Sequence, residues 1–218
     1  ELDHRIGDLP RLIKLEILNC PEDFELPDEL LKIAGLKNLR LAFPLPSAAR
    51  APRMLAELPL EHLELFGELP SPLPLIPTLR SLSLLIGDAK QDITTLARNN
   101  LQLRELKIWG GKGIHDDVKL FKKLETLRLV SCEIHQLSPA LKELKYLRCL
   151  EIRGQLLRTL PDFIGEISSL EELILCTELA APVVAVLLLA VHQDNYPLLG
   201  LYILALWMSL IGSQGVTV

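Results

Sequence analysis

The residues with the clearest potential for chemistry are Cys132, Glu133 and His135, in the stretch KLETLRLVSCEIHQL at 123–137. Thiolate, imidazole and carboxylate groups bind zinc, and a cysteine beside a histidine can also act as a nucleophile. A metal site needs further ligands close by, and the neighbouring segments have none at matching positions. The first question is therefore whether these residues belong to a repeated element instead.

Two other segments contain residue types that bind phosphate or metal. GGKG at 110–113 is shorter than the phosphate-binding motif G-x-x-x-x-G-K-[ST], and here Lys112 is followed by glycine. His115, Asp116 and Asp117 could bind a metal, but adjacent side chains at the start of a helix diverge. No Ser-His-Asp or Cys-His arrangement is visible in the sequence. We therefore predict no metal and no cofactor, and a protein that is not an enzyme.

The segment around Cys132 is one copy of a hexamer, L-x-x-L-x-L, that recurs along the chain. Its eight copies start at Leu12, Leu36, Leu60, Leu79, Leu103, Leu124, Leu147 and Leu170. The last two apolar residues of each copy are two positions apart, so they point to the same side of a strand. Such a strand cannot bury its apolar face alone. We therefore expect the copies to stack side by side around one continuous core.

This spacing resembles that of the leucine-rich-repeat family, in which the hexamer is followed by x-x-N or x-x-C. The resemblance covers about residues 6–179. It implies an α/β fold: a right-handed solenoid, or horseshoe, with a parallel β-sheet on the concave side and short helices or turns on the convex side. It also implies that Cys20 and Cys132 are buried and bond neighbouring loop backbone. The other six copies have other residues at this position, which predicts a looser turn than a regular asparagine ladder.

The segment LPDFIGEISSLEEL at 160–173, together with LKYLRCLEI at 144–152, is similar to repeats of plant nucleotide-binding leucine-rich-repeat immune receptors. Other intracellular leucine-rich-repeat proteins of bacteria and animals have similar segments. This resemblance implies a recognition domain that acts in defence signalling. No nucleotide-binding motif is present, so the ATPase part of such a receptor would precede Glu1.

The connectors between the hexamers are predicted to be short helical turns. Residues 26–36, 137–147 and 160–170 align with one another, and Pro27 and Pro161 stand at a helix start, where a missing N–H costs nothing. The leucines that follow at helical spacing should face the strands.

Two further connectors have different predicted conformations. Residues 114–124 should form the same kind of helical turn, with Asp116 or Asp117 as its N-cap. Residues 44–77 hold eight of the 15 prolines, so we expect an extended or polyproline-like connector there and no helix. That connector is either a tight turn or a docking segment for a proline-recognition domain.

Residues between the leucines should form columns on the open face of the sheet. One column reads Leu18, Ala42, Phe66, Leu85, Trp109, Val130, Arg153 and Cys176. We hypothesise that Phe66, Leu85 and Trp109 form an apolar anchor for a protein or peptide, because aromatic residues and arginines are frequent interface anchors. The complete predicted binding set is Arg40, Phe43, Glu64, Phe66, Leu85, Lys107, Trp109, Arg128 and Val130. The alternative is that this column packs under the following loops as a margin of the core.

Charge and cysteine content limit the classes of partner and compartment. The net charge is −5, so nucleic-acid binding is not expected. Four scattered cysteines favour reduced thiols over a disulfide framework, and no N-x-[ST] sequon is present. Both features favour a cytoplasmic protein.

We divide the chain into a solenoid of about eight repeats at 1–179 and an apolar tail at 180–218. Three interpretations of the tail are open. It could cap the solenoid, or insert through residues 180–212 into a membrane or a partner, or be an unnatural continuation such as a shifted reading frame. Each of its apolar runs is shorter than the roughly 20 residues that span a bilayer.

Together these features predict a non-enzymatic module for protein–protein interaction that binds its partner on the concave face. The resemblance adds the recognition domain of an immune receptor as its role. Two alternatives are a membrane-anchored scaffold and the regulatory region of an enzyme whose catalytic domain precedes Glu1. The oligomeric state is left open.

Overall fold

The computed structural model describes residues 2–21, 24–43, 53–67, 73–85, 93–111, 116–154, 157 and 159–176. All of them belong to one unit, Glu1–Leu188. The predicted tail at 180–218 lies outside the described residues. Within the described ranges, no helix has the length and apolar character needed to cross a membrane.

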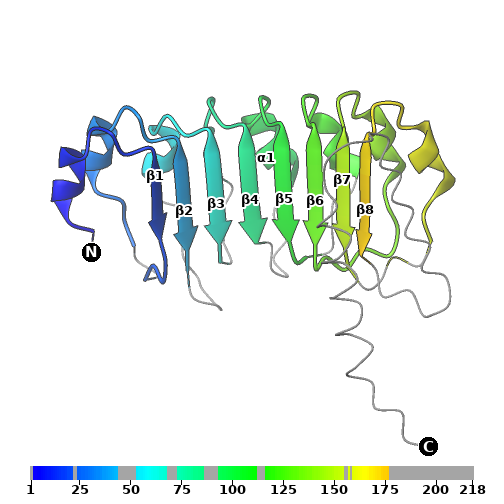
Figure 1. Ribbon diagram of the computed structural model, residues 1–218, viewed down its shortest axis with the longest axis horizontal. Coiled ribbons are helices and arrows are strands. Elements are labelled where there is room, and N and C mark those ends of the chain that lie inside the picture. The colour runs from blue at the N-terminus through cyan, green and yellow to red at the C-terminus, as the bar shows by residue number, and fades with distance from the viewer. Residues whose placement is uncertain are drawn as a thin grey trace, which may run out of the picture. The chain divides into compact units, whose positions relative to one another are not determined.

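Eight strands form one parallel sheet in which each strand pairs with the next in the sequence (Figure 1). They are β1 (Lys14–Ile17), β2 (Asn38–Ala42), β3 (His62–Phe66), β4 (Ser81–Leu85), β5 (Glu105–Trp109), β6 (Thr126–Val130), β7 (Cys149–Arg153) and β8 (Glu172–Cys176). Every predicted hexamer supplies one strand. The single parallel sheet confirms the stacking that the leucine spacing predicts.

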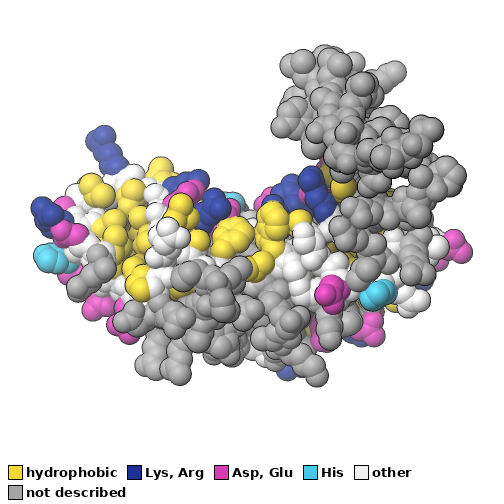
Figure 2. Space-filling model, turned by 90° about the horizontal axis from the view of Figure 1, so that it is seen from below, with side chains coloured by type: hydrophobic (Ala, Val, Ile, Leu, Met, Phe, Trp, Pro, Cys, Tyr) yellow, Lys and Arg dark blue, Asp and Glu magenta, His cyan; other side chains and the backbone are white. Residues whose placement is uncertain are grey.

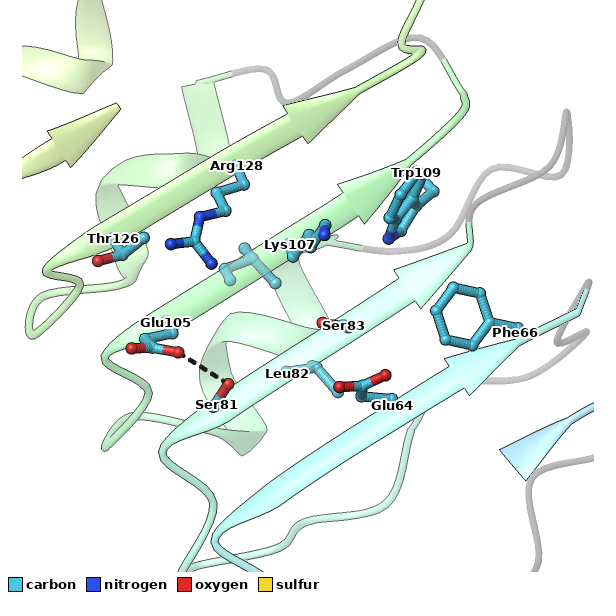
Figure 3. Close-up of a pocket in the computed structure, with 11 residues that line it drawn as sticks. Glu64, Phe66, Ser81, Leu82, Ser83, Glu105, Lys107, Trp109, Thr126 and Arg128 are labelled. Atoms are coloured by element: carbon cyan, nitrogen blue, oxygen red, sulfur yellow. Dashed lines mark hydrogen bonds between the residues drawn. The ribbon is translucent and has the colours of Figure 1, made fainter. Parts of the chain in front are cut away.

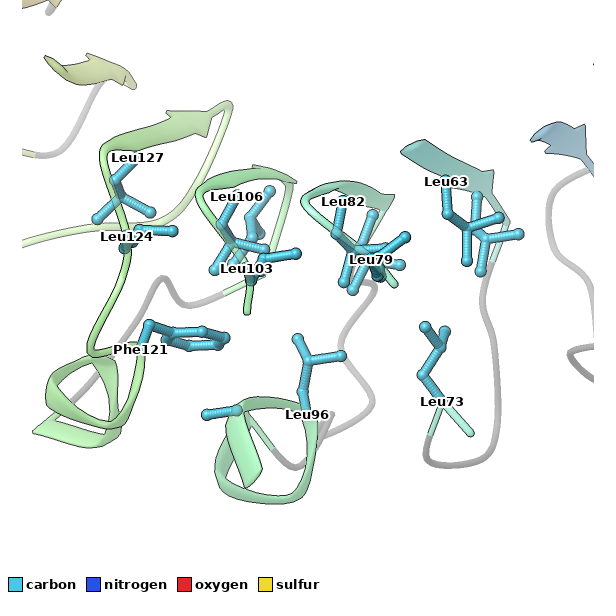
Figure 4. Close-up of a cluster of buried hydrophobic side chains, with 14 of the residues drawn as sticks. Leu63, Leu73, Leu79, Leu82, Leu96, Leu103, Leu106, Phe121, Leu124 and Leu127 are labelled. Atoms are coloured by element: carbon cyan, nitrogen blue, oxygen red, sulfur yellow. The ribbon is translucent and has the colours of Figure 1, made fainter. Parts of the chain in front are cut away.

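The leucines of successive strands stand opposite one another and make the core. Leu39, Leu63 and Leu82 are register partners from β2 to β4, and the same row continues through Leu106 and Leu127. All five are buried. Figure 4 shows strand leucines on one side of this core and connector side chains on the other. A fully buried leucine contributes roughly 1.5–3 kcal/mol, so this row supplies a large share of the stability.

In the part of the chain that the structure describes, the connectors contribute mainly 3-10 helices, together with one short α-helix. The 3-10 helices are η1 (His4–Asp8), η2 (Asp28–Lys32), η3 (Arg53–Ala56), η4 (Asp116–Leu120), η5 (Pro139–Glu143) and η6 (Asp162–Glu166), and α1 is Ile93–Asn99. Helical turns at η2, η4, η5 and η6 confirm the predictions for those four connectors. Each of these four turns buries one aliphatic side chain, and these are Leu30, Val118, Leu141 and Ile164.

Two predictions about the connectors are wrong. Residues 44–77 were expected to contain no helix, yet η3 lies within them; RMLA at 53–56 contains no proline, and Leu55 is fully buried. The other correction concerns the start of η4. Asp116 and Asp117 lie in its first turn rather than before it. Asp116 instead accepts a hydrogen bond from the Ser138 hydroxyl at 2.5 Å.

Several strands end at residues with a left-handed backbone. Asn19, Gly67, Gly110 and Ser131 have φ values of 58°, 136°, 72° and 52° and lie just after β1, β3, β5 and β6. Glycine and asparagine adopt this conformation more easily than other residues. These turns break the extended backbone directly beyond the column that contains Phe66, Trp109 and Val130. That column therefore lies at the edge where the strands end.

Candidate functional site

Cys132, Glu133 and His135 do not converge on a site. The Cys132 side chain is buried and donates to the carbonyl oxygens of Val130 and Ile108 at 3.5 and 3.7 Å. Burial raises the pKa of this thiol to about 11. Glu133 and His135 are exposed. The structure thus places Cys132 in the buried, backbone-bonded position that the repeat resemblance implies. No group of three or more potential metal ligands occurs in the described part of the chain.

The open face of the sheet contains a pair of aromatic rings. Phe66 ends β3 and Trp109 ends β5, and their ring centroids are 6.2 Å apart at an interplanar angle of 57°. Because β4 lies between these strands, the two rings lean towards each other over it (Figure 3). Both side chains are half-buried. Tilted ring pairs at this distance are favourable by about 0.5–1.5 kcal/mol beyond the area they bury.

A cation lies over each ring. The Arg40 guanidinium is 5.0 Å from the Phe66 centroid, and the Lys107 ammonium is 4.3 Å from the Trp109 centroid. Both distances are within the range of cation–π attraction. Arg40 also approaches Glu64 at 3.6 Å. The rings and cations therefore hold one another in place on the face of the sheet.

A hollow of about 170 Å³ lies beside the rings. Its lining comes from four adjacent strands, β3 to β6, and includes Glu64, Phe66, Ser81, Ser83, Glu105, Lys107, Trp109, Thr126 and Arg128. Ser81 and Ser83 on β4 have short side chains, and they leave space between the longer side chains of the adjacent strands (Figure 3). Ser81 Oγ donates to Glu105 at 3.1 Å across one side of the hollow.

On β5 to β7 the positive side chains of the open face outnumber the carboxylates that pair with them. Lys107 and Arg128 are register partners on β5 and β6, so two cations stand side by side. Arg128 Nε is 3.1 Å from a carboxylate oxygen of Glu151, and Arg153 binds the other oxygen of the same carboxylate. Glu151 is only 7% exposed. One buried carboxylate therefore forms ion pairs with two arginines.

The predicted binding set divides into surface and core residues. Phe66, Leu85 and Trp109 are half-buried on the open face, as are the flanking Arg40, Glu64, Lys107 and Arg128. Phe43 is 5% exposed and belongs to the core, and Val130 is 8% exposed. These two residues add no exposed surface, so we leave them out of the site. Residues 86–92 and 112–115, which follow β4 and β5, lie outside the described residues, and the core-margin alternative is therefore not tested.

Figure 2 looks at the molecule from the edge where the strands end. Hydrophobic side chains gather along this edge, next to groups of Lys and Arg side chains. A mixture of aromatic, aliphatic and basic groups is suited to binding another macromolecule.

Three residues of the site were not singled out from the sequence. Ser81 and Ser83 alternate with leucines on one strand, and their small size is the signal that predicts a hollow. Glu151 alternates with core residues of β7, and its burial depends on the arginines of two strands. A column position alone does not predict burial of this kind.

Comparison with known proteins identifies the fold. The chain is similar to an internalin (inlF) from Listeria monocytogenes, with a TM-score of 0.53 and 22% identity over 81% of this chain and 51% of that one. It is also similar to the leucine-rich-repeat domain of the type III effector XopL, with a TM-score of 0.52 and 20% identity over 78% of this chain and 65% of that one. A Leptospira interrogans leucine-rich-repeat protein, LIC12759, gives a TM-score of 0.50 and 20% identity over 83% and 53% of the two chains.

The chain spans between 51% and 65% of the length of these three structures. No protein-family model matches the sequence, and no curated protein matches it. The structural likeness and the eight ordered parallel strands establish a leucine-rich-repeat solenoid. The resemblance to plant immune receptors stays a prediction.

Proposed function

We propose that this chain is a protein–protein interaction module that binds its partner on the open face of the sheet around Trp109. The observation that carries the proposal is the Phe66–Trp109 pair, held half-buried between two cations beside a hollow. Trp and Arg are enriched among the residues that dominate binding energy at interfaces. Ordered before any partner arrives, these side chains would lose little freedom on binding.

The size of the surface supports a macromolecular partner over a small molecule. A hollow of about 170 Å³ is below the roughly 300–1,000 Å³ of small-molecule pockets. Eight strands spaced at about 4.8 Å offer a face roughly 34 Å across. That width accommodates an interface of standard size, about 800 Å² on each side.

For the finer role we propose the cytoplasmic recognition part of an immune receptor. Its support is the sequence resemblance of residues 144–173 to plant receptor repeats. The protein sequence that precedes Glu1 tests this role. A P-loop domain there would support it, a signal peptide would instead favour an extracellular scaffold, and a catalytic domain would favour the regulatory role.

The binding surface itself is tested by substitution of its aromatic residues. A partner is first isolated from an extract of the source organism on the immobilised chain, and its affinity is then measured by calorimetry. We expect Trp109→Ala to weaken binding by more than about tenfold, since central aromatic residues cost about 2 kcal/mol or more when truncated. Phe66→Ala should weaken the same complex.

Tyr146→Ala provides the matched control, because Tyr146 is an aromatic side chain that is 61% exposed in the turn before β7. This variant should bind like the unchanged chain. Circular dichroism confirms that each variant is folded before its affinity is measured. Partner affinities that are unchanged in both Trp109→Ala and Phe66→Ala would overturn the proposed surface.

A further inference from the structure

We propose that the partner segment bound by this face presents an acidic side chain, an Asp or Glu carboxylate next to an apolar residue, which binds between Lys107 and Arg128. This inference rests on the proposed function and adds the chemistry of the partner. The apolar residue would contact Phe66 and Trp109, and the carboxylate would enter the hollow above Ser83.

The first argument is the like-charge pair. Lys107 and Arg128 are direct register partners on adjacent strands. Like charges placed directly opposite in a sheet are destabilising. On the other side of Lys107 the register partner is Ser83, which carries no charge. Neither register neighbour of Lys107 is an acid, and an incoming anion would neutralise the pair of cations.

The second argument is the shortage of carboxylates. On β5 to β7 the open face presents Lys107, Arg128 and Arg153, and Glu151 is the carboxylate that faces the two arginines. For Lys107, the described residues provide the Trp109 ring and no carboxylate within ion-pair distance.

The acids that line the hollow are already engaged. Glu64 pairs with Arg40 at 3.6 Å, and Glu105 accepts a hydrogen bond from Ser81. These two carboxylates flank the hollow on the β3 and β5 sides, whereas the cation pair lies on β5 and β6. The positive charge is therefore concentrated at one end of the site.

The third argument is a donor without an acceptor. Trp109 Nε1 has no hydrogen-bond partner among the described residues. Unpaired buried donors cost free energy, so native structures rarely leave them unsatisfied. Figure 3 shows Lys107 between Trp109 and Arg128. A carboxylate that pairs with Lys107 would draw its ammonium off the ring and uncover the indole N–H.

A protein segment fits these features better than a nucleic acid. Glu64 and Glu105 line the same hollow and would repel a row of phosphates. The net charge of −5 also disfavours a polyanion, whose binding depends on many phosphate contacts. A single carboxylate needs only the local pair of cations.

Peptide selection tests the inference and requires no identified partner. A displayed library of random dodecapeptides is selected against the 218-residue chain and against the Lys107→Gln/Arg128→Gln variant, and the recovered peptides are sequenced. We expect Asp or Glu beside an apolar residue to be enriched on the unchanged chain and not on the variant. A selected peptide should bind the variant about tenfold more weakly, as for the loss of charge-assisted hydrogen bonds.

The matched control is Lys122→Gln/Lys145→Gln, which removes two positive charges from exposed turns away from the open face. It should retain the acidic preference. Replacing the peptide's acid by its amide, Gln or Asn, should weaken binding to the unchanged chain by a similar factor. In ¹⁵N spectra the Trp109 indole N–H signal should shift on titration with the acidic peptide.

The two proposals fail in distinguishable ways. If Trp109→Ala abolishes peptide binding while the selected peptides show no acidic enrichment, the open face binds partners and the acidic inference is wrong. If phosphate or oligonucleotide shifts the Trp109 indole signal and acidic peptides do not, the inference is also wrong. If no selected peptide responds to Trp109→Ala or Phe66→Ala, both proposals are overturned.

Discussion

Single residues show how closely adjacent repeats pack. A Cβ atom built on Gly154 would lie 2.8 Å from the backbone carbonyl oxygen of Cys132 in the preceding repeat. Backbone cannot move away as a flexible side chain can, so this approach requires glycine. Gly165 in η6 is the opposite case, because a Cβ there would meet nothing within 4 Å.

We therefore expect Gly154→Ala to lower the free energy of unfolding by about 1–3 kcal/mol, the usual cost of overpacking. Gly165→Ala should be neutral or slightly stabilising, since alanine restricts the unfolded chain more than glycine does. Urea denaturation of the two variants measures both values. Equal stability of the two variants would contradict the close approach of adjacent repeats.

The cysteines differ in exposure in a way that labelling can detect. Cys20, Cys132 and Cys149 are buried, and Cys176 is exposed. Burial, reinforced by Glu172, raises the pKa of Cys149 to about 12, and burial raises that of Cys132 to about 11. At a pH of about 8 these two thiols stay protonated and do not react as thiolates.

Iodoacetamide at a pH of about 8 should therefore modify Cys176 first and leave the other three thiols protected until the chain unfolds. Mass spectrometry of peptides after timed labelling checks the order in which the cysteines are modified. Early modification of Cys132 would disagree with its burial.

The raised pKa values of Cys132 and Cys149 also make the stability of the fold depend on pH, because the protonated thiols favour the folded state. Their contribution to the free energy of unfolding is complete below the unfolded pKa of about 9 and is lost as the pH rises towards about 11 and about 12.

At the scale of the element, the rows of buried leucines contribute more to stability than the ion pairs between repeats. Neighbouring repeats are joined at the edge where the strands begin by Lys37–Glu61, Arg104–Glu125 and Arg148–Glu171, at 2.7, 2.9 and 3.0 Å. These pairs are largely solvent-exposed, and such pairs contribute only about 0–1 kcal/mol each. A buried leucine contributes roughly 1.5–3 kcal/mol, so the core decides the register.

Strand β8, which ends the described part of the sheet, is less well buried than the inner strands. Leu129 in β6 is 2% exposed, whereas the row to which it belongs continues through Ile152 and ends in β8 with Leu175, which is 42% exposed. Each repeat of a solenoid contacts only its neighbours, and among the described strands β8 pairs with β7 alone, whereas an inner strand pairs with two neighbours.

Leu129→Ala should therefore lower the free energy of unfolding by about 2–5 kcal/mol through loss of burial and formation of a cavity. Leu175→Ala should cost less than about 1 kcal/mol, as expected at a largely exposed position. Thermal and urea denaturation compare the two variants. A larger loss at Leu175 would mean that β8 is covered more completely than its exposure indicates.

At the scale of the whole molecule, the eight described strands share one core. These strands and the described buried residues that pack against them lie within 2–176. The structure does not test whether residues 180–218 cap the solenoid or insert elsewhere. The packing of the eight repeats nevertheless predicts how a shortened chain behaves.

We expect a chain ending at residue 179 to keep the far-ultraviolet circular dichroism of the parallel sheet. Its melting temperature then separates the interpretations of the tail. A lower value than that of the intact chain would support a cap on β8, whereas an unchanged value with improved solubility would support insertion into a membrane or a partner. Loss of the sheet in the shortened chain would contradict the independence of the described core.

Much of the architecture could be predicted from local spacing. The period of the leucines predicts each strand, and connectors such as 137–147 and 160–170 predict helical turns, because both patterns involve residues close in sequence. The columns of the open face also follow from alternation along a strand. The helical turn η3 was not predicted, because the prolines on either side of its short apolar segment indicated an extended connector.

The sequence by itself determined that eight similar units stack through aliphatic rows, since a strand with one apolar face must find a neighbour. Only the tertiary structure decided which members of the columns stay accessible. Phe43 and Val130 are buried while Phe66 and Trp109 meet over β4, and Glu151 is shared by arginines of two strands. These outcomes depend largely on side chains about 20 or more residues apart in the sequence, whose sizes and charges act together only after the strands pair.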